Sequence, residues 1–249
     1  MKKIDGFALV TGASRGLGKE MALRCAADGH NIVVNYTSEK SRAAAERVAA
    51  QAREKYGRRA AVIKCDVSKY DECRQMLKKA SEEMGERMAI LVANAGIKNL
   101  LSFDELTHEE YERVISVNLM GVMNAVHCSI PYMKDGKGAS IIMISSIAGQ
   151  MGAAKRADYA TTKSAMYGFM KSLCRELGDY GIRVNCIAPG MIMTDMLRNN
   201  DPEILKENTK AQCLHFIAEP VEIADAMSYL NTAQYVDGQI LAVNGGWYM

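Results

Sequence analysis

The sequence predicts an α/β fold, with one doubly wound parallel sheet and helices on both of its faces. Short apolar runs alternate with longer amphipathic segments along the 249 residues, and this alternation is typical of strand–helix–strand units. The apolar runs are continuous, as expected of parallel strands that are buried on both faces. No linker, repeat or low-complexity segment divides the chain, so we expect a single domain over residues 1–249.

Each apolar run is followed by a helical pattern, and together they give the expected order of elements. We expect strands at residues 7–10, 31–35, 60–64, 88–92, 140–144, 182–187 and 239–243. We expect helices at about residues 16–28, 38–56, from 68 onward, 107–133, 159–177 and 220–230. Capping-box spacing at Ser68 and Thr107, and a proline at Pro220, mark helix starts. Residues 191–219 contain no expected strand, and we predict that they form a mobile substrate lid.

The composition argues against several classes of function. The formal net charge is only +2, which is too small to indicate a nucleic-acid partner. The seven cysteines are odd in number and form no CxxC pair, so we expect neither a disulfide framework nor a metal site. This cysteine usage fits a reducing, cytoplasmic setting. No apolar run reaches the length of a membrane span, and Asp5 interrupts any signal-peptide pattern, so we expect no membrane association.

A glycine-rich segment, TGASRGLG at residues 11–18, lies between the first expected strand and the first helix. Backbone N–H groups at a helix start attract anions, and glycines let a dinucleotide pyrophosphate approach the backbone closely. The glycine spacing is wider than GxGxxG, and a turn without a ligand could share it. The position after the first strand favours a dinucleotide loop. Its expected cofactor contacts are Gly12, Ser14, Arg15, Gly16, Leu17 and Gly18.

The end of the second expected strand, Asn35-Tyr36-Thr37-Ser38, indicates which dinucleotide binds. A carboxylate here would bind the ribose 2′-hydroxyl and repel a 2′-phosphate, and none is present. Arg15 can reach a phosphate, and Thr37 and Ser38 can donate hydrogen bonds to it. The sequence therefore predicts NADP(H) rather than NAD(H), with Asn35 among the contacts, although Arg15 could also be a solvated loop charge.

Tyr159 and Lys163 are four residues apart on an expected helix, so their side chains share one face. An ordinary tyrosine pKa of about 10 is too high for proton transfer near neutrality, and a neighbouring ammonium would lower it. Ser146 follows the fifth strand, where ligands bind in open α/β sheets, and could bind a substrate oxygen. Asn118 is an amide in an apolar helical stretch. Each residue alone has a structural explanation, but together they favour proton-transfer catalysis.

These motifs, in this order, resemble those of the classical short-chain dehydrogenase/reductase family over essentially the whole chain. Residues 11–18 match the family's TGxxxGxG loop, and Ser146, Tyr159 and Lys163 match its catalytic signature. Asn118 matches the fourth member of the catalytic tetrad. The NAG turn and the PGxxxT segment are matched by Asn94, Ala95, Gly96, Pro189, Gly190, Ile192 and Thr194.

The resemblance implies a Rossmann-type fold and a role for each matched residue. Tyr159 would be the general acid in carbonyl reduction, and Ser146 would orient the carbonyl. Lys163 would lower the tyrosine pKa and bind the nicotinamide ribose, and Asn118 would hold a water of a proton relay. The NAG turn and PGxxxT residues would contact the cofactor, and Asp66 and Val67 would border its adenine. A homotetramer, formed through the helices after Thr107 and Tyr159, is also implied.

Within that family the resemblance is strongest to 3-oxoacyl-acyl-carrier-protein reductases of fatty acid biosynthesis. It is carried by residues 35–36, 159–176, 223–226 and 243–249. It implies NADPH-dependent reduction of a 3-oxoacyl thioester that an acyl carrier protein delivers. Two basic residues usually dock that carrier, and here they correspond to Lys137 and Tyr180, so one charge is missing.

Two other functions remain open from the sequence. A hydroxysteroid or other secondary-alcohol dehydrogenase would use the same chemistry with a different lid. A non-catalytic NADP(H)-binding protein is disfavoured, because a pure binder needs no proton relay. Lys155 and Arg156 lie near the expected mouth of the site and could meet a free carboxylate or a coenzyme A phosphate, or be solvated surface charges.

Overall fold

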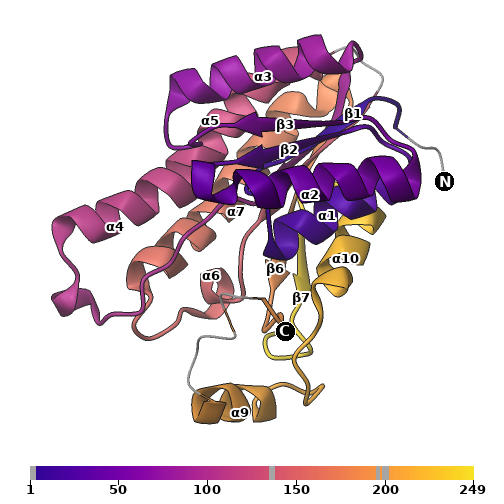
Figure 1. The fold of residues 1–249 in the computed structure, drawn as a ribbon. Helices are drawn as coiled ribbons and strands as arrows, with labels where there is room; N and C mark the ends of the chain where they lie inside the picture. Colours follow the sequence, from indigo (N-terminus) through magenta and orange to yellow (C-terminus); the bar gives the residue numbers. More distant parts are fainter. Residues whose placement is uncertain (1–3, 135–137, 195–196, 198–201) are drawn as a thin grey trace.

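The computed structural model describes residues 4–134, 138–194, 197 and 202–249. Seven parallel strands form one sheet in the order β3-β2-β1-β4-β5-β6-β7 (Figure 1). The strands are β1 (Phe7–Val10), β2 (Ile32–Tyr36), β3 (Ala60–Lys64), β4 (Met88–Ala93), β5 (Ala139–Ile144), β6 (Ile182–Pro189) and β7 (Ile240–Val243). This sheet confirms the predicted doubly wound fold.

Helices cover both faces of the sheet, as Figure 1 shows. One layer consists of α1 (Gly16–Ala27), α2 (Glu39–Tyr56) and α10 (Pro220–Thr232). The other consists of α3 (Tyr70–Met84), α5 (Gly121–Ser129) with α4 (His108–Ile115) extending from it, and α7 (Ala157–Leu177). The chain turns from one half of the sheet to the other between β1 and β4, so the loops that follow these two strands meet at a topological switch point.

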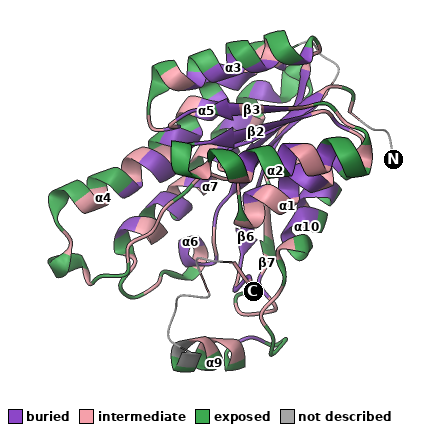
Figure 2. Ribbon diagram, in the orientation of Figure 1, coloured by how far each residue is buried: buried purple, intermediate pink, exposed green. Residues whose placement is uncertain are grey.

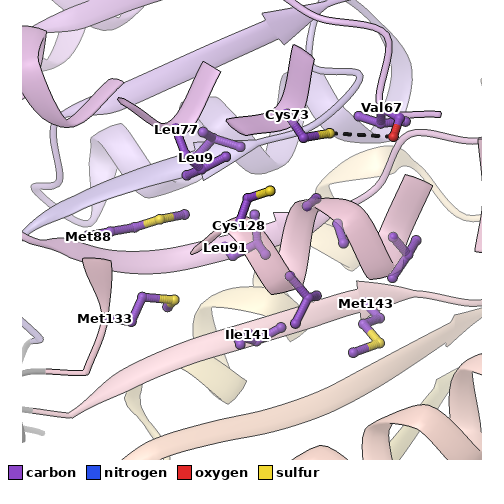
Figure 3. Packing of buried hydrophobic residues seen from close by; sticks show 14 of the residues in the cluster. Leu9, Val67, Cys73, Leu77, Met88, Leu91, Cys128, Met133, Ile141 and Met143 are labelled. Carbon is purple, nitrogen blue, oxygen red and sulfur yellow. Dashed lines mark hydrogen bonds between the residues drawn. The ribbon is translucent and has the colours of Figure 1, made fainter. Parts of the chain in front are cut away.

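Two hydrophobic clusters, one on each face, hold the helices to the sheet. Leu9 of β1 and Leu91 of β4 pack with Leu77 of α3 and Ile141 of β5 on one face (Figure 3). Their neighbours in the strands point to the opposite face, because side chains alternate along a strand. Figure 2 shows the result: the central strands β1, β2, β4, β5 and β6 are buried, and α2 and α3 expose their outer surfaces. The continuous apolar runs in the sequence reflect this two-sided burial.

One of the two predicted capping boxes forms and the other does not. Thr107 Oγ1 accepts the Glu110 backbone N–H at 3.2 Å, and Glu110 accepts the Thr107 backbone N–H at 2.9 Å, which confirms the start of α4. The predicted box at Ser68 is wrong, because α3 begins one residue after Lys69 and has no side-chain cap. The Ser68 hydroxyl instead donates to Asp66 Oδ1 at 2.7 Å. The Asp66 carboxylate, two residues away, binds the hydroxyl in place of the helix N–H groups.

The predicted helix over residues 107–133 is continuous but contains a π-helical turn, η2 (Ser116–Met120). The helix His108–Tyr132 is long and apolar enough to cross a membrane by length and composition, with a mean hydropathy of 1.3. The expectation that nothing reaches this length was wrong, because the residues that interrupt the apolar run, such as Asn118 and His127, are uncharged. In the fold, 44% of the tested window is buried, and the helix contacts α3 and α7.

The segment predicted as a lid contains no strand within its described residues, but it does contain a helix. Helix α9 (Pro202–Lys210) lies on the side of the short helix α6 (Ala148–Met151) and the C-terminus, away from the sheet layers (Figure 1). The ends of the segment are tied together, because Ile192 pairs with Ala218 in a parallel bridge. Residues 195–196 and 198–201 lie outside the described residues. The lid role remains a prediction.

Candidate active site

The loop between β1 and α1 has a conformation that requires its glycines. Gly12 and Gly16 have left-handed φ values of 63° and 54°, which side chains disfavour. A Cβ on Gly18 would lie 2.4 Å from the Gly12 carbonyl oxygen. The loop conformation itself therefore requires these glycines.

The start of α1 is prepared for an anion. Its N-cap residue, Arg15, makes no side-chain cap, and its first turn contains no acidic residue. The first backbone N–H groups of the helix and the positive end of its dipole thus remain available to a pyrophosphate. Ser14 is half-buried in the loop, and Leu17 packs against the hydrophobic cluster of this face.

Thr11 joins this loop to the turn after β4. Its Oγ1 accepts the backbone N–H groups of Asn94 at 2.9 Å and Ala95 at 3.0 Å. Asn94 Nδ2 returns a hydrogen bond to the Thr11 carbonyl at 2.9 Å. The predicted phosphate loop and the NAG turn are therefore one cradle across the switch point. Thr11 was not among the predicted cofactor contacts, although its place at the end of an apolar strand is a usable signal.

Asn35 does not face the cofactor, and the prediction that it contacts the ligand is wrong. The side chain is 0% exposed. Its Oδ1 accepts the Gly12 backbone N–H at 3.0 Å, and its Nδ2 donates to the carbonyls of Cys65 at 3.1 Å and Ile63 at 3.3 Å. The amide thus supports the phosphate loop from below. Burial forces every polar atom to find a partner inside the protein.

The other residues predicted to bind a 2′-phosphate are at the surface. Arg15, Thr37 and Ser38 are exposed, and Arg15 forms no ion pair with any described residue. Ser38 exchanges hydrogen bonds with Ser41 in a capping box at the start of α2. Their side chains remain accessible to a ligand at the end of β2.

Asp66 and Val67, predicted to border the adenine, lie directly beyond β3. Asp66 Oδ1 accepts the backbone N–H of Ser68 at 3.1 Å in addition to its hydroxyl. Val67 is 3% exposed, and a Cβ on Gly121 would lie 2.6 Å from its Cγ2. This close contact holds the β3–α3 loop against α5.

Asn118 lies in the π-helical turn and clamps the segment after the NAG turn. Its Oδ1 accepts the Ile97 backbone N–H at 2.8 Å, and its Nδ2 donates to the Ile97 carbonyl at 2.8 Å. Nδ2 also donates to the hydroxyl of Thr162 on α7 at 3.3 Å, and Thr162 was not among the predicted site residues. π-Helical turns are often found at functional sites, and this one places an amide between two elements.

The side chains of Lys163 and Asn118 both approach Gly96. A Cβ on Gly96 would lie 3.3 Å from Asn118 Oδ1 and 3.6 Å from Lys163 Nζ. Lys163 Nζ donates to the Ile144 carbonyl at 2.7 Å, and its own carbonyl accepts the Ser145 hydroxyl at 2.8 Å. The lysine is thus fixed at the carboxyl end of β5, at the edge of the sheet where ligands bind.

Tyr159 and Ser146 complete the cluster. Lys163 Nζ is 5.5 Å from the centre of the Tyr159 ring, so the two side chains share one face of α7 as predicted. A side-chain interaction with Ser146 lowers the pKa of Tyr159, and Ser146 Oγ accepts the Ala148 backbone N–H at 3.1 Å. The Tyr167 hydroxyl donates to the Ser146 carbonyl at 3.0 Å and fixes the backbone there.

Burial shifts the pKa values of Tyr159 and Lys163 in opposite directions. It raises the pKa of Tyr159, and the Ser146 hydrogen bond and the Arg156 charge offset only part of this rise. It lowers the pKa of Lys163 to about 8. Burial, Ser146 and Arg156 account for the shift of the Tyr159 pKa, so the role of Lys163 in lowering it stays a prediction. A lysine pKa near 8 suits proton exchange at working pH.

The segment after β6 runs from the sheet edge to the phosphate loop. A Cβ on Gly190 would lie 2.7 Å from the Asn244 Cα, and a Cβ on Gly16 would lie 3.9 Å from Thr194 Cγ2. The Pro189 carbonyl accepts the Ile147 backbone N–H at 2.9 Å, and Ile192 is buried. This contact places the PGxxxT residues beside the loop predicted to hold the cofactor.

Metal ligands do not gather in the part of the chain that the structure describes: no group of three or more His, Cys, Asp or Glu residues there could hold an ion. The polar groups of the site are hydroxyls, amides, an ammonium and backbone N–H groups.

Replacing Asn35 with Asp should destabilise the protein rather than simply change its cofactor preference. The carboxylate would face the carbonyls of Ile63 and Cys65, which now accept from the amide. We expect the free energy of unfolding in urea to fall by about 1–3 kcal/mol. Thr37→Asp, which adds the same charge at an exposed position, should change it by less than about 0.5 kcal/mol. Equal stability of both variants would contradict the structural role of Asn35.

Lys163 should make stability depend on pH in a defined window. Between a folded pKa of about 8 and an ordinary value of 10.5, the unfolded chain holds a proton that the folded protein has released. Stability therefore rises as the pH increases from about 8 to 10.5, and below about pH 8, where both states hold the proton, it no longer depends on this group. Relative to Lys163→Met, the wild-type free energy of unfolding should gain up to about 3 kcal/mol. Parallel pH curves from urea titrations of the two proteins would disprove this assignment.

Comparison with known proteins agrees with this geometry. A family model described as short chain dehydrogenase matches residues 6–204. A 3-oxoacyl-(acyl-carrier-protein) reductase of Staphylococcus epidermidis is 36% identical, over 97% of this chain and 98% of its own. A short chain dehydrogenase from Burkholderia cenocepacia, solved in complex with NADP, superposes with a TM-score of 0.91 at 28% identity over 99% of each chain.

A blue fluorescent protein from a metagenomic library, solved in complex with NADPH, superposes with a TM-score of 0.92 at 33% identity over 100% of each chain. The resemblance inferred from the motifs is thereby confirmed. The chain belongs to the short-chain dehydrogenase family and is an oxidoreductase.

Proposed function

We propose that the protein reduces a carbonyl to a secondary alcohol with NADPH. One observation carries this proposal: Ser146, Tyr159 and Lys163 lie together at the carboxyl edge of the sheet, beside a loop whose backbone suits a dinucleotide. A binding protein without catalysis would need the loop but not the proton-transfer group.

The choice of NADP(H) rests on the end of β2. No carboxylate is present there to repel a 2′-phosphate, and Arg15 is exposed and free of ion pairs with described residues. Thr37 and Ser38 offer exposed hydroxyls. The two solved relatives contain NADP and NADPH. We assign the same cofactor to this chain.

In this proposal the bound nicotinamide supplies the hydride, and the protein handles the proton. The Ser146 hydroxyl binds the carbonyl oxygen, and the Tyr159 hydroxyl donates its proton to that oxygen as charge develops. Lys163, with a pKa near 8, returns a proton toward Tyr159. Asn118 is the far end of this relay and holds the segment at Ile97 in place.

The substrate that we favour is a 3-oxoacyl thioester, and the named relative reduces such a compound on an acyl carrier protein. Tyr180 replaces one expected docking charge, but Lys134 lies 4.1 Å from the centre of its ring and keeps a cation at that surface. Lys137, the other expected docking residue, lies outside the described residues. A hydroxysteroid or other secondary-alcohol dehydrogenase is the second candidate, which the tyrosine at position 180 favours.

We further propose a homotetramer in the cytoplasm. Met120 and Met123 are exposed on the helix that follows Thr107, where the family forms subunit contacts. All seven cysteines are free thiols, which fits a reducing compartment. Light scattering of the purified protein measures the assembly directly.

Replacing Tyr159 with Phe should abolish turnover and leave cofactor binding intact. The variant removes only the hydroxyl that donates the proton, so we expect kcat to fall by a factor of about 100 or more. NADPH binding, followed by fluorescence, should stay within about twofold of wild type. A Tyr159→Phe protein that still turns over at the wild-type rate would refute the assignment.

The substrate is tested by NADPH oxidation with a short 3-oxoacyl thioester, a steroid ketone and a simple ketone, repeated with NADH. Fastest turnover of the thioester with NADPH supports the reductase. Turnover confined to a steroid ketone would support the same proton-transfer chemistry but favour the second candidate, a hydroxysteroid dehydrogenase. A preference for NADH would contradict the reading of Arg15.

A further inference from the structure

We propose that Lys98 and Arg156 form a subsite for an anionic group, a carboxylate or a phosphate, on the carbonyl substrate. This inference rests on the proposed function, because it places the anion beside the proposed proton donor. It predicts that the preferred substrates carry a negative charge close to the reacting carbonyl.

The two cations lie on segments that meet at the mouth of the site. Lys98 follows the NAG turn by two residues, and the position of Gly96 in that turn is 3.6 Å, measured from an added Cβ, from Lys163 Nζ. Arg156 is the N-cap of α7, three residues before Tyr159. Asn99 Nδ2 donates to Asp158 Oδ2 at 2.9 Å and joins the two segments.

Both cations are half-buried, and neither forms an ion pair with a residue that the structure describes. Their charges act on each other, since burial first and the Arg156 charge second lower the pKa of Lys98 to about 8. The Arg156 charge also lowers the pKa of Tyr159. Two like charges kept together without a partner are unfavourable unless a ligand supplies the opposite charge.

The acid next to these segments in sequence does not neutralise them. Asp158 is 4% exposed, and its two oxygens accept hydrogen bonds from Asn99 and from the Tyr159 backbone N–H, at 2.9 and 2.7 Å. Its carboxylate therefore serves to connect the loops. The charge of Arg156 instead acts on Lys98 and on Tyr159.

Lys155 adds a third cation beside them. It is exposed, and its φ of 61° is the only left-handed value among non-glycine residues that the structure describes. Glycine would adopt this conformation without strain. Strain at a non-glycine residue often marks a functional position, and here it occurs at the residue directly before Arg156.

Two natural sources share this chemistry: the carboxylate of a free 3-oxo acid and the phosphates of a coenzyme A thioester. A guanidinium can bind either group through two parallel hydrogen bonds, and a lysine adds a point charge. We test both sources with acetoacetate and acetoacetyl-coenzyme A. Acetoacetyl-N-acetylcysteamine is the matched thioester without a charge.

The key variant is Lys98→Gln, and Lys171→Gln, an exposed lysine elsewhere on α7, is its control. For at least one anionic substrate, we expect Lys98→Gln to raise KM about tenfold, with kcat little changed. KM for the uncharged thioester should stay the same in all proteins. A rise in KM with acetoacetate alone identifies a carboxylate site. A rise in KM with the coenzyme A thioester alone identifies a phosphate site. Equal effects on charged and uncharged substrates would overturn the subsite.

Two further measurements keep the subsite and the proposed function separable. Calorimetry with the NADP⁺-loaded protein should detect binding of acetoacetate or of coenzyme A itself, and Lys98→Gln should weaken it. Wild-type KM for the anionic substrate should also rise with ionic strength, which needs no variant to fold. Turnover of the uncharged thioester without any anion binding removes the subsite and leaves the reductase. Lys98-dependent binding without turnover of any ketone removes the reductase and leaves the subsite.

Discussion

The site depends on one junction, in which the Thr11 hydroxyl accepts two backbone N–H groups. Thr11 Oγ1 accepts from Asn94 and Ala95 and so fixes the loop after β1 against the turn after β4. These strands are neighbours in the sheet but are separated by two other strands in sequence. Together with the pairing of β1 and β4, this junction holds the phosphate loop against the turn that contains Gly96. Gly96 in turn lies next to Asn118 and Lys163, so the cofactor cradle and the proton-transfer cluster adjoin each other.

Other buried polar side chains hold neighbouring backbone segments of the site in place. Asn35 supports the phosphate loop from below, and Asn118 clamps the backbone at Ile97. Leaving any of these groups unpaired would cost about 1–3 kcal/mol each, so the arrangement has little freedom to relax. A network that is fully satisfied is rigid, and rigid placement is what proton transfer to a substrate oxygen requires.

The sequence was sufficient for features that depend on local spacing. Continuous apolar runs gave the strands, and the four-residue spacing of Tyr159 and Lys163 gave their shared face. It was insufficient where several segments compete for one group. The Ser68 hydroxyl is bound by Asp66 and not by the helix, and the Asn35 side chain bonds to several backbone groups. The pKa directions of Tyr159 and Lys163 depend on burial, which no local pattern contains.

Burial favours the uncharged forms of Tyr159 and Lys163. The charges of neighbouring residues therefore affect how readily the tyrosine loses its proton. Arg156 supplies such a charge, which lowers the tyrosine pKa. An anion bound between Lys98 and Arg156 would cancel part of that charge and raise the tyrosine pKa again. Reduction requires a protonated tyrosine, since the hydroxyl must donate. A substrate that carries its own negative charge would thus favour the protonation state that reduces it.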